Sequence, residues 1–314
     1  MDDKSKIEQR FLKDELSDYE LYKSIEHGEK DKVLKGLVKK LKNTEYKHAK
    51  IWASLIGEKH IENVGIPFRS KLRVVLYPII RKILGVAFVT KLLERNEANG
   101  LNEYEELVKK NGLGVKELKK VRGIIVDEQE HEKLLIEETQ KHETRLNYTR
   151  SIIFGMNDGL VEILAVIAGL AMVSTSSLIV AISGIIVGVS GTLSMAAGAY
   201  ISSKSEKVVE KSLNENTVDT KPSKEAYYTG IFYFFGALVA TYPFLLGASG
   251  YIGILEAVVS VAIVLSIAST LIAIISDTNV KNRVIEMLAV SLGAALVTAI
   301  IGFTVRVVLG IVIS

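Results

Sequence analysis

The chain has 314 residues, a formal net charge of +3 and no cysteine, which excludes disulfides, thiolate metal sites and iron–sulfur centres. The charge is unevenly distributed, because residues 1–149 hold 30 of the 39 Lys and Arg, 26 of the 36 Asp and Glu and all five His. We therefore predict an all-α protein of two domains, with a soluble domain over 1–147 and a membrane domain over 148–314.

Helical periodicity dominates the first domain. It predicts helices over 5–27, 29–57, 86–111 and 115–147, and the last of these continues into the first membrane span. One spacing of residues occurs twice on these helices. The first copy comprises Glu15, Tyr22, Glu45 and His48, and the second comprises Glu97, Tyr104, Glu128 and His131. The tyrosine follows the first glutamate by seven residues in both copies, and the Glu-x-x-His motif follows it by 30 or 31.

This repeat predicts a site for two metal ions. Residues three apart share a helix face, so each Glu-x-x-His motif points one carboxylate and one imidazole in the same direction. Four-helix bundles of di-iron proteins combine two such motifs with one Glu from each of the other two helices. These ligands suit iron, with manganese or zinc as alternatives, and two cations would balance the buried carboxylates.

Other residues near the repeat have more than one interpretation. Glu94, one turn before Glu97, is a further candidate ligand, and a surface role fits it equally well. We expect Tyr22 and Tyr104 to hydrogen-bond to ligands or to pack in the core, and Trp52 to pack in the core. The basic and apolar segment 66–82 either lies on an anionic membrane surface or forms a crossover packed along the bundle.

The second domain contains five apolar runs long enough to span a bilayer, over about 151–173, 178–200, 226–247, 252–275 and 284–312. Basic residues concentrate in the connections after the second and fourth runs, which places those connections in the cytoplasm. The N-terminal segment is charged throughout and does not resemble a signal peptide. We therefore expect a cytoplasmic N-terminal domain and an external C-terminus.

Two carboxylates lie within the first predicted span. Asp158 and Glu162 are four residues apart and hence on one helix face. A carboxylate at that depth is costly unless it is paired, solvated or bound to a cation, so both are candidates for a transport pathway. The alternative is an interfacial carboxylate that reaches water.

Two motifs in this half resemble the vacuolar iron transporter family. They are RSIIFGMNDGLV at 150–161 and GTLSMAAGAYIS at 191–202. The resemblance implies a dimeric, proton-coupled exporter of ferrous iron or a similar divalent metal, with Asp158 and Met195 as translocation ligands. The chain departs from the family at Ala199, where many members have Glu, and Glu162 or Glu206 is a possible replacement. The connection over about 201–225 is also too short for the metal-collecting domain of the plant transporters.

The N-terminal repeat resembles rubrerythrin and the ferritin-like superfamily over about 5–147, and the whole architecture resembles membrane-bound ferritin proteins. These resemblances imply an exporter of Fe(II), or of Mn(II), whose bundle collects or senses metal. The alternative is a membrane-anchored di-iron ferroxidase or peroxide-consuming enzyme, although the chain lacks rubredoxin cysteines. The implied partners are a divalent metal substrate, a lipid bilayer (the cell membrane) and a second copy of the chain, with no nucleic acid.

Overall fold

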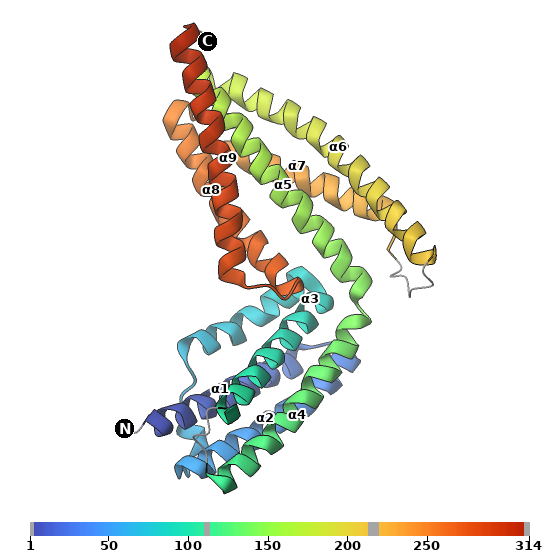
Figure 1. Ribbon diagram of the computed structural model, residues 1–314, viewed down its shortest axis with the longest axis vertical. Coiled ribbons are helices and arrows are strands. Elements are labelled where there is room, and N and C mark those ends of the chain that lie inside the picture. Colours follow the sequence, from blue (N-terminus) through green and yellow to red (C-terminus); the bar gives the residue numbers. More distant parts are fainter. Residues whose placement is uncertain (1–2, 110–113, 213–219, 311–314) are drawn as a thin grey trace. The chain divides into compact units, whose positions relative to one another are not determined.

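The computed structural model describes residues 3–109, 114–212 and 220–310, and its regular structure there is helical throughout. The chain divides into two compact units, Met1–His142 and Glu143–Ser314. Figure 1 shows the helices of both units.

The described residues of unit 1 form four long helices and a short 3-10 helix, Ile61–Asn63. The long helices are α1 (Asp3–Gly28), α2 (Lys32–Ile56), α3 (Phe68–Lys109) and α4 (Val115–Gln140). Helix α1 packs against α2 and α3, and α4 packs against α3 and α2. The predicted helices 5–27 and 29–57 correspond to α1 and α2, whereas the last residues of predicted helix 86–111 lie outside the described part.

Two apolar clusters fill the interior of unit 1, and polar residues separate them along every helix. One cluster contains Leu21, Ile25, Leu34, Val38, Leu41, Val89, Leu93 and Leu135. The other contains Phe11, Leu12, Ala49, Trp52, Ala53, Val121 and Ile124. On α2, for example, the buried Glu45 and His48 lie between Leu41 of the first cluster and Ala49 of the second. The predicted ligands therefore form a polar layer between two apolar ones, which exclude water and hold the helices in place.

Helix α3 begins earlier than the sequence predicts. Residues 68–84 form a helix, and the backbone at Gly85 (φ +80°, ψ −178°) separates it from the helix that follows. Only glycine adopts that conformation readily, so Gly85 allows the chain to change direction between two helical stretches. Pro67 precedes the first turn, and its carbonyl oxygen accepts hydrogen bonds from Ser70 N (3.0 Å) and Lys71 N (3.1 Å). The segment 66–82 is thus mostly helical, and Tyr77 packs into the first apolar cluster of unit 1, as expected for a crossover along the bundle.

The predicted continuous helix from 115 through the first span is wrong. Helix α4 ends at Gln140, and α5 begins at Glu143. At the break, His142 N donates to Thr139 O at 2.9 Å, three residues back instead of four. Such a tight turn ends the α-helical hydrogen-bond ladder.

Unit 2 contains α5 (Glu143–Val173), α6 (Ser177–Ser212), α7 (Pro222–Leu245), α8 (Gly250–Ile275) and α9 (Val280–Leu309). All five are long and apolar enough to cross a membrane, which confirms the predicted number of spans within the described residues. Helix α5 lies between the pair α6–α7 and the pair α8–α9 (Figure 1) and contacts all four. Its buried residues, such as Leu160, Ile163 and Leu164, form the centre of the apolar core.

Glycines allow a close contact between α5 and α7 in unit 2. A Cβ atom at Gly155 would overlap the carbonyl oxygen of Thr229, and one at Gly159 would overlap that of Tyr233. A Cβ at Gly236 on α7 would lie 2.5 Å from the carbonyl oxygen of Met156. Helices in membranes associate through such small residues, because lipid removes the hydrophobic drive for packing.

Candidate functional site: a di-metal centre and an intramembrane carboxylate pair

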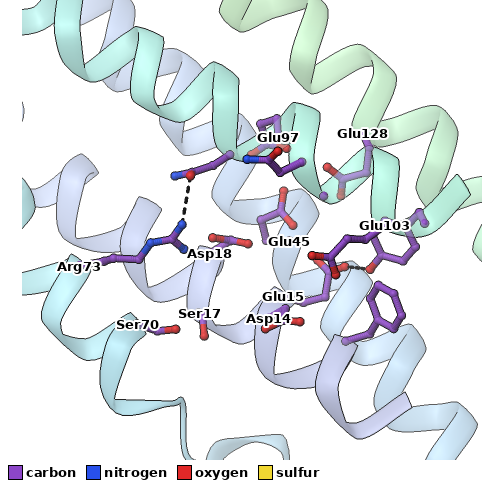
Figure 2. A pocket seen from close by; sticks show the side chains of 15 residues that line it. Asp14, Glu15, Ser17, Asp18, Glu45, Ser70, Arg73, Glu97, Glu103 and Glu128 are labelled. Atoms are coloured by element: carbon purple, nitrogen blue, oxygen red, sulfur yellow. Dashed lines mark hydrogen bonds between the residues drawn. The ribbon is translucent and has the colours of Figure 1, made fainter. Parts of the chain in front are cut away.

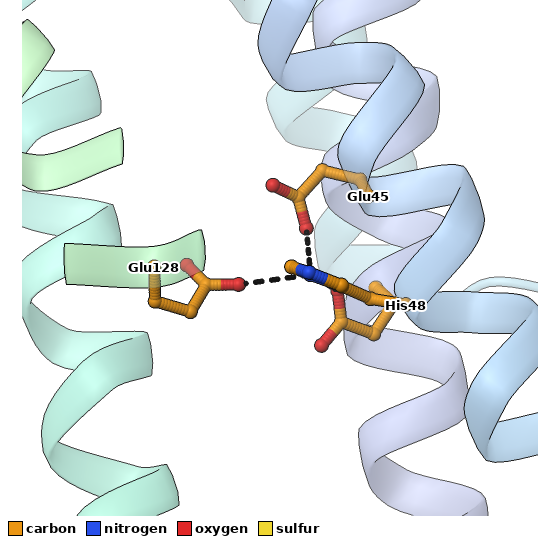
Figure 3. Close-up of side chains that lie close together, drawn as sticks. Glu45, His48 and Glu128 are labelled. Carbon is orange, nitrogen blue, oxygen red and sulfur yellow. Dashed lines mark ion pairs between the residues drawn. The ribbon is translucent and has the colours of Figure 1, made fainter. Parts of the chain in front are cut away.

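The first group of potential metal ligands surrounds His48 in the polar layer of unit 1. Figure 3 shows the His48 Nδ1 atom facing the carboxylates of Glu45 and Glu128. Its distances are 3.1 Å to Glu128 Oε1, 3.4 Å to Glu15 Oε2 and 3.6 Å to Glu45 Oε2. All four side chains are buried. Helices α1, α2 and α4 therefore converge on one imidazole nitrogen.

A second group surrounds His131 and repeats this geometry. The His131 Nδ1 atom lies 3.1 Å from Glu45 Oε1, 3.5 Å from Glu97 Oε2 and 3.8 Å from Glu128 Oε2. Glu45 and Glu128 thus present one carboxylate oxygen to each histidine. Each distance around His48 differs by at most 0.2 Å from the distance between the equivalent residues of the other copy around His131. Two bridging carboxylates and two terminal ones are the arrangement expected around a pair of cations.

The atoms facing each other in these groups suit metal coordination. In each group, one ligand atom per residue can be chosen so that all lie within 4.8 Å of one another. Glu45 Oε1, His48 Nδ1 and His131 Nδ1 are buried and make no hydrogen bond within the described part of the chain. Buried polar atoms normally have partners, so three unpartnered nitrogen and oxygen atoms at one point suit the coordination of a cation.

Hydrogen bonds across the repeat orient the terminal carboxylates. Tyr22 donates to Glu97 Oε1, and Tyr104 donates to Glu15 Oε1, so each tyrosine serves the glutamate of the other copy. Burial, followed by the charge of Glu97, keeps the pKa of Tyr22 well above its usual range, so this hydroxyl stays protonated. Trp52 Nε1 donates to the Tyr104 hydroxyl at 2.9 Å, which gives this core residue a polar role that the sequence did not reveal.

The two halves of the site differ at the outer nitrogens. His48 Nε2 lies 3.2 Å from Asp127 Oδ2, whereas the residue in the equivalent position of the first copy is Thr44, whose hydroxyl bonds to Lys40 O. A carboxylate on the far nitrogen fixes the ring and strengthens its metal-binding nitrogen. Nothing in the sequence repeat identified Asp127, because the repeat does not include it.

The cluster holds protons when it contains no metal. Burial, and then the charge of Glu45, raises the pKa of Glu128 to about 9. Burial alone would lower the pKa of His131, but the carboxylates of Glu45 and Glu97 outweigh it and raise this pKa to about 10. Burial also raises the pKa of Glu15 well above its usual value. A cation that enters must displace these protons.

These shifts predict how the stability of metal-free unit 1 depends on pH. Glu128 and His131 bind protons in the folded chain up to about pH 9 and 10, whereas their reference values are 4.5 and 6.5. The folded state therefore binds more protons in this window, and its free energy of unfolding should fall as the pH rises. We expect a loss of about 5 kcal/mol between pH 7 and 9, because each of the two groups contributes about 1.4 kcal/mol per pH unit while it keeps its proton. Urea unfolding followed by Trp52 fluorescence would measure it, because Trp52 is buried in unit 1 and is the only tryptophan.

Saturating Mn(II) provides the control for this measurement. The bound cation replaces the protons, so the decline between pH 7 and 9 should disappear. A metal-free stability that rises over the same interval would contradict the proton-holding cluster.

A cavity of about 190 Å³ leads to the cluster from the surface of unit 1 (Figure 2). Its lining includes Glu15, Glu45, Glu97 and Glu128 of the site, with Asp14, Asp18 and Glu103 further out. Burial, and then the charge of Glu45, raises the pKa of Asp18 well above its usual value. The sequence repeat does not include Asp18, although this residue lies one turn after Glu15 on α1. Glu94 is not in either ligand group, and its carboxylate pairs with Lys91 at 2.5 Å.

In unit 2, Asp158 and Glu162 lie on the same face of α5 within a candidate span. The Tyr233 hydroxyl of α7 donates to Glu162 Oε2 at 2.7 Å. Tyr233 is fully buried, and a Cβ atom at Gly191 would overlap its hydroxyl, so α6 leaves space for this ring. Both carboxylates are evident from the sequence, whereas Tyr233 is not, because an aromatic residue in an apolar span is ordinary.

Met195 lies on α6 beside a separate cavity of about 660 Å³. Asn157, Ala199 and Glu206 also line this cavity, and Asp158 is not among the described residues around it. The buried Asn157 Oδ1 makes no hydrogen bond within the described residues. Ala199 stands where many members of the resembled family have Glu. Glu206, a candidate to replace that carboxylate, lines the same cavity as Ala199.

Comparison with known families decides the nature of unit 2. The model of the VIT family matches residues 149–218 and 208–303. Residues 149–303 are a VIT family domain. This VIT domain contains both quoted motifs and the five candidate spans almost in full, and it points to a membrane metal transporter. A search of curated proteins found no match to the chain.

Proposed function

We propose that the chain exports a divalent metal, Fe(II) or Mn(II), from the cytoplasm across the cell membrane, and that unit 1 collects or senses this metal. The observation that carries the proposal is the pair of buried ligand groups in unit 1, on the same chain as a VIT domain. A membrane anchor would require a single helix and no carboxylate within a span. The direction follows from the basic residues after the second and fourth spans, which favour a cytoplasmic unit 1.

The arrangement of unit 1 supports a ferritin-like, rubrerythrin-type role in binding two ions. Glu45 and Glu128 would be shared between the two ions, and Glu15 with His48, or Glu97 with His131, would complete each ligand set. The acidic cavity would attract cations from solution, because its carboxylates lie close together in a partly dehydrated site.

Asp158 and Glu162 support a transport pathway coupled to protons. Glu162 is exposed and Asp158 is only partly buried in the single chain, although both lie within an apolar span. Carboxylates facing lipid are costly, so this face of α5 favours contact with a second copy of the chain. The proposed homodimer would enclose the carboxylates, which could then exchange protons for the metal substrate. Met195 would supply a soft thioether to the same substrate.

Transport in proteoliposomes tests the proposal. With unit 1 outside and an acidic lumen, Fe(II) or Mn(II) should accumulate in the lumen in exchange for protons. Asp158→Ala should reduce this uptake at least tenfold, because it removes the pathway carboxylate and any proton it transfers. Glu286→Ala is the matched control, since Glu286 is exposed and pairs with Arg283 at 3.1 Å. Equal uptake by the Asp158→Ala variant and the unchanged chain would reject the assigned pathway.

The alternative, a membrane-anchored di-iron oxidase, is favoured by the two bridging carboxylates that hold the metal positions close together. It predicts that the full chain oxidises many equivalents of Fe(II) in the presence of oxygen. A transporter that only collects metal would stop at about two equivalents per chain, the number of positions in the site. Stopped-flow spectroscopy on the detergent-solubilised chain distinguishes the two.

A further inference from the structure

The first helical stretch of α3, residues 68–84, has two faces of different character. The inner face carries Tyr77, which is 4% exposed, with Val74 and Ile80 packed against the same apolar cluster. Arg81 on this side donates to the buried Glu29 at 2.8 and 3.0 Å. The helix is therefore anchored to unit 1 along one side.

The outer face of the same helix is apolar and exposed. Its residues are Phe68, Leu72, Val75, Leu76, Ile79 and Ile83, and they are between 40% and 79% exposed. Their spacing of three and four residues aligns them in one stripe, about 100° wide on a helix with 3.6 residues per turn. Single exposed apolar residues are common, but six in one continuous stripe indicate a binding surface.

Basic residues flank this stripe on both sides. Arg69 lies along one edge, and Lys71 and Lys82 lie along the other, and all three are exposed. Residues 63–93 contain no Asp or Glu. The local charge is therefore strongly positive, next to an acidic cavity on the other side of the helix.

We propose that helix 68–84 binds an anionic phospholipid surface, with its apolar stripe in the interfacial region and its basic flanks on the headgroups. Interfacial helices combine these two features, and each exposed Lys or Arg near an anionic surface adds about 1 kcal/mol. The VIT domain on the same chain ties unit 1 to a bilayer, which raises the effective concentration of lipid around the helix.

The charge pattern favours lipid over a second copy of unit 1. A two-fold dimer through this stripe would place the same patch against itself, and its cations would face cations. An anionic surface offers the opposite charge to all three flanking residues at once. Arg73, on the inner side, lines the cavity of the metal site and bonds to Asn96 Oδ1 at 3.0 Å, so membrane docking would also fix one wall of that cavity.

Site-directed spin labelling of the full chain tests the proposal. The chain has no cysteine, so Val75→Cys or Ile79→Cys gives a single labelling position on the stripe. Val126→Cys on α4 is the matched control, because Val126 is also apolar and 64% exposed. In nanodiscs of phosphatidylcholine with phosphatidylglycerol, labels at 75 and 79 should collide readily with oxygen and rarely with a water-soluble nickel complex. The label at 126 should show the reverse.

A charge-removal variant separates the possible outcomes. Substitution of Arg69, Lys71 and Lys82 by Gln should weaken binding of the helix to the anionic surface about a hundredfold or more. Each basic side chain contributes about 1 kcal/mol to this binding, and the substitution removes three of them. Stripe labels as accessible to nickel as the label at 126 would overturn the proposal. Protection that is equal in phosphatidylcholine alone would overturn the assignment to an anionic surface. Strong spin–spin coupling between stripe labels, independent of lipid charge, would instead assign the surface to a second copy.

Discussion

Replacement of Glu128 by glutamine should abolish binding of both metal ions in unit 1. Glu128 Oε1 faces His48, and Oε2 faces His131, so one substitution removes a charged ligand from both positions. The side chain keeps its size, and the buried layer keeps its packing. We expect affinity for Mn(II) or Fe(II) to fall roughly a hundredfold or more, because each position loses a charge-assisted contact.

Metal content per chain after equilibrium dialysis measures this effect. Glu130→Gln is the matched control, since Glu130 is two residues away on α4, exposed and paired with Lys40 at 2.7 Å. Glu15→Gln should behave differently from both, because Glu15 belongs to only one ligand group. Loss of one ion in Glu128→Gln, or of two in Glu15→Gln, would contradict the bridging assignment.

Replacement of Gly159 by alanine should destabilise unit 2 by about 3 kcal/mol. The new methyl group would overlap the carbonyl oxygen of Tyr233, a backbone atom that cannot rotate away. Helices α5 and α7 would have to separate, and the contacts of Gly155 and Gly236 along the same seam would loosen with them. Membrane helices depend on such close packing for their association.

Size-exclusion chromatography of the heated, detergent-solubilised chain would measure this effect. The temperature at which half of the folded-chain peak is lost should be lower for the variant. Gly293→Ala on α9 is the control, because a Cβ atom there meets no other atom within 4 Å. Trp52 fluorescence in the same samples should report unchanged unfolding of unit 1. A Gly159→Ala chain as heat-resistant as the control would show that α5 and α7 are not held at this seam.

The features that the sequence predicted are those with a regular period. Apolar runs define the five spans of unit 2, and the spacing around Glu45 and Glu128 places each carboxylate on the same face as a histidine. The structure brings the six predicted ligands of unit 1 together in one buried layer. Both results depend on local spacing, which a helix converts directly into position.

The features that escaped prediction have no periodic signature. Two of them are local, namely the turn at His142, whose N–H donates to Thr139 O, and the kink in α3 at Gly85. The pairing of Asp127 with His48 joins α4 to α2, and that of Tyr233 with Glu162 joins α7 to α5. These two pairings exist only in the tertiary arrangement, so the spacing of residues along the chain does not indicate them.

The crossed tyrosines make the two copies of the repeat depend on each other. Tyr22 donates a hydrogen bond to Glu97, and Tyr104 donates one to Glu15. Glu128 contacts His48 and Glu45 contacts His131, so each of these glutamates contacts the histidine of the other copy. One helix pair alone would therefore contain every ligand type yet could complete no metal position. Two identical pairs related by a two-fold axis would complete both. Unit 1 thus contains, within one chain, the ligand pattern of two helix pairs related by a two-fold axis. The pairing of Asp127 with His48, at the position where the other copy has Thr44, breaks this symmetry.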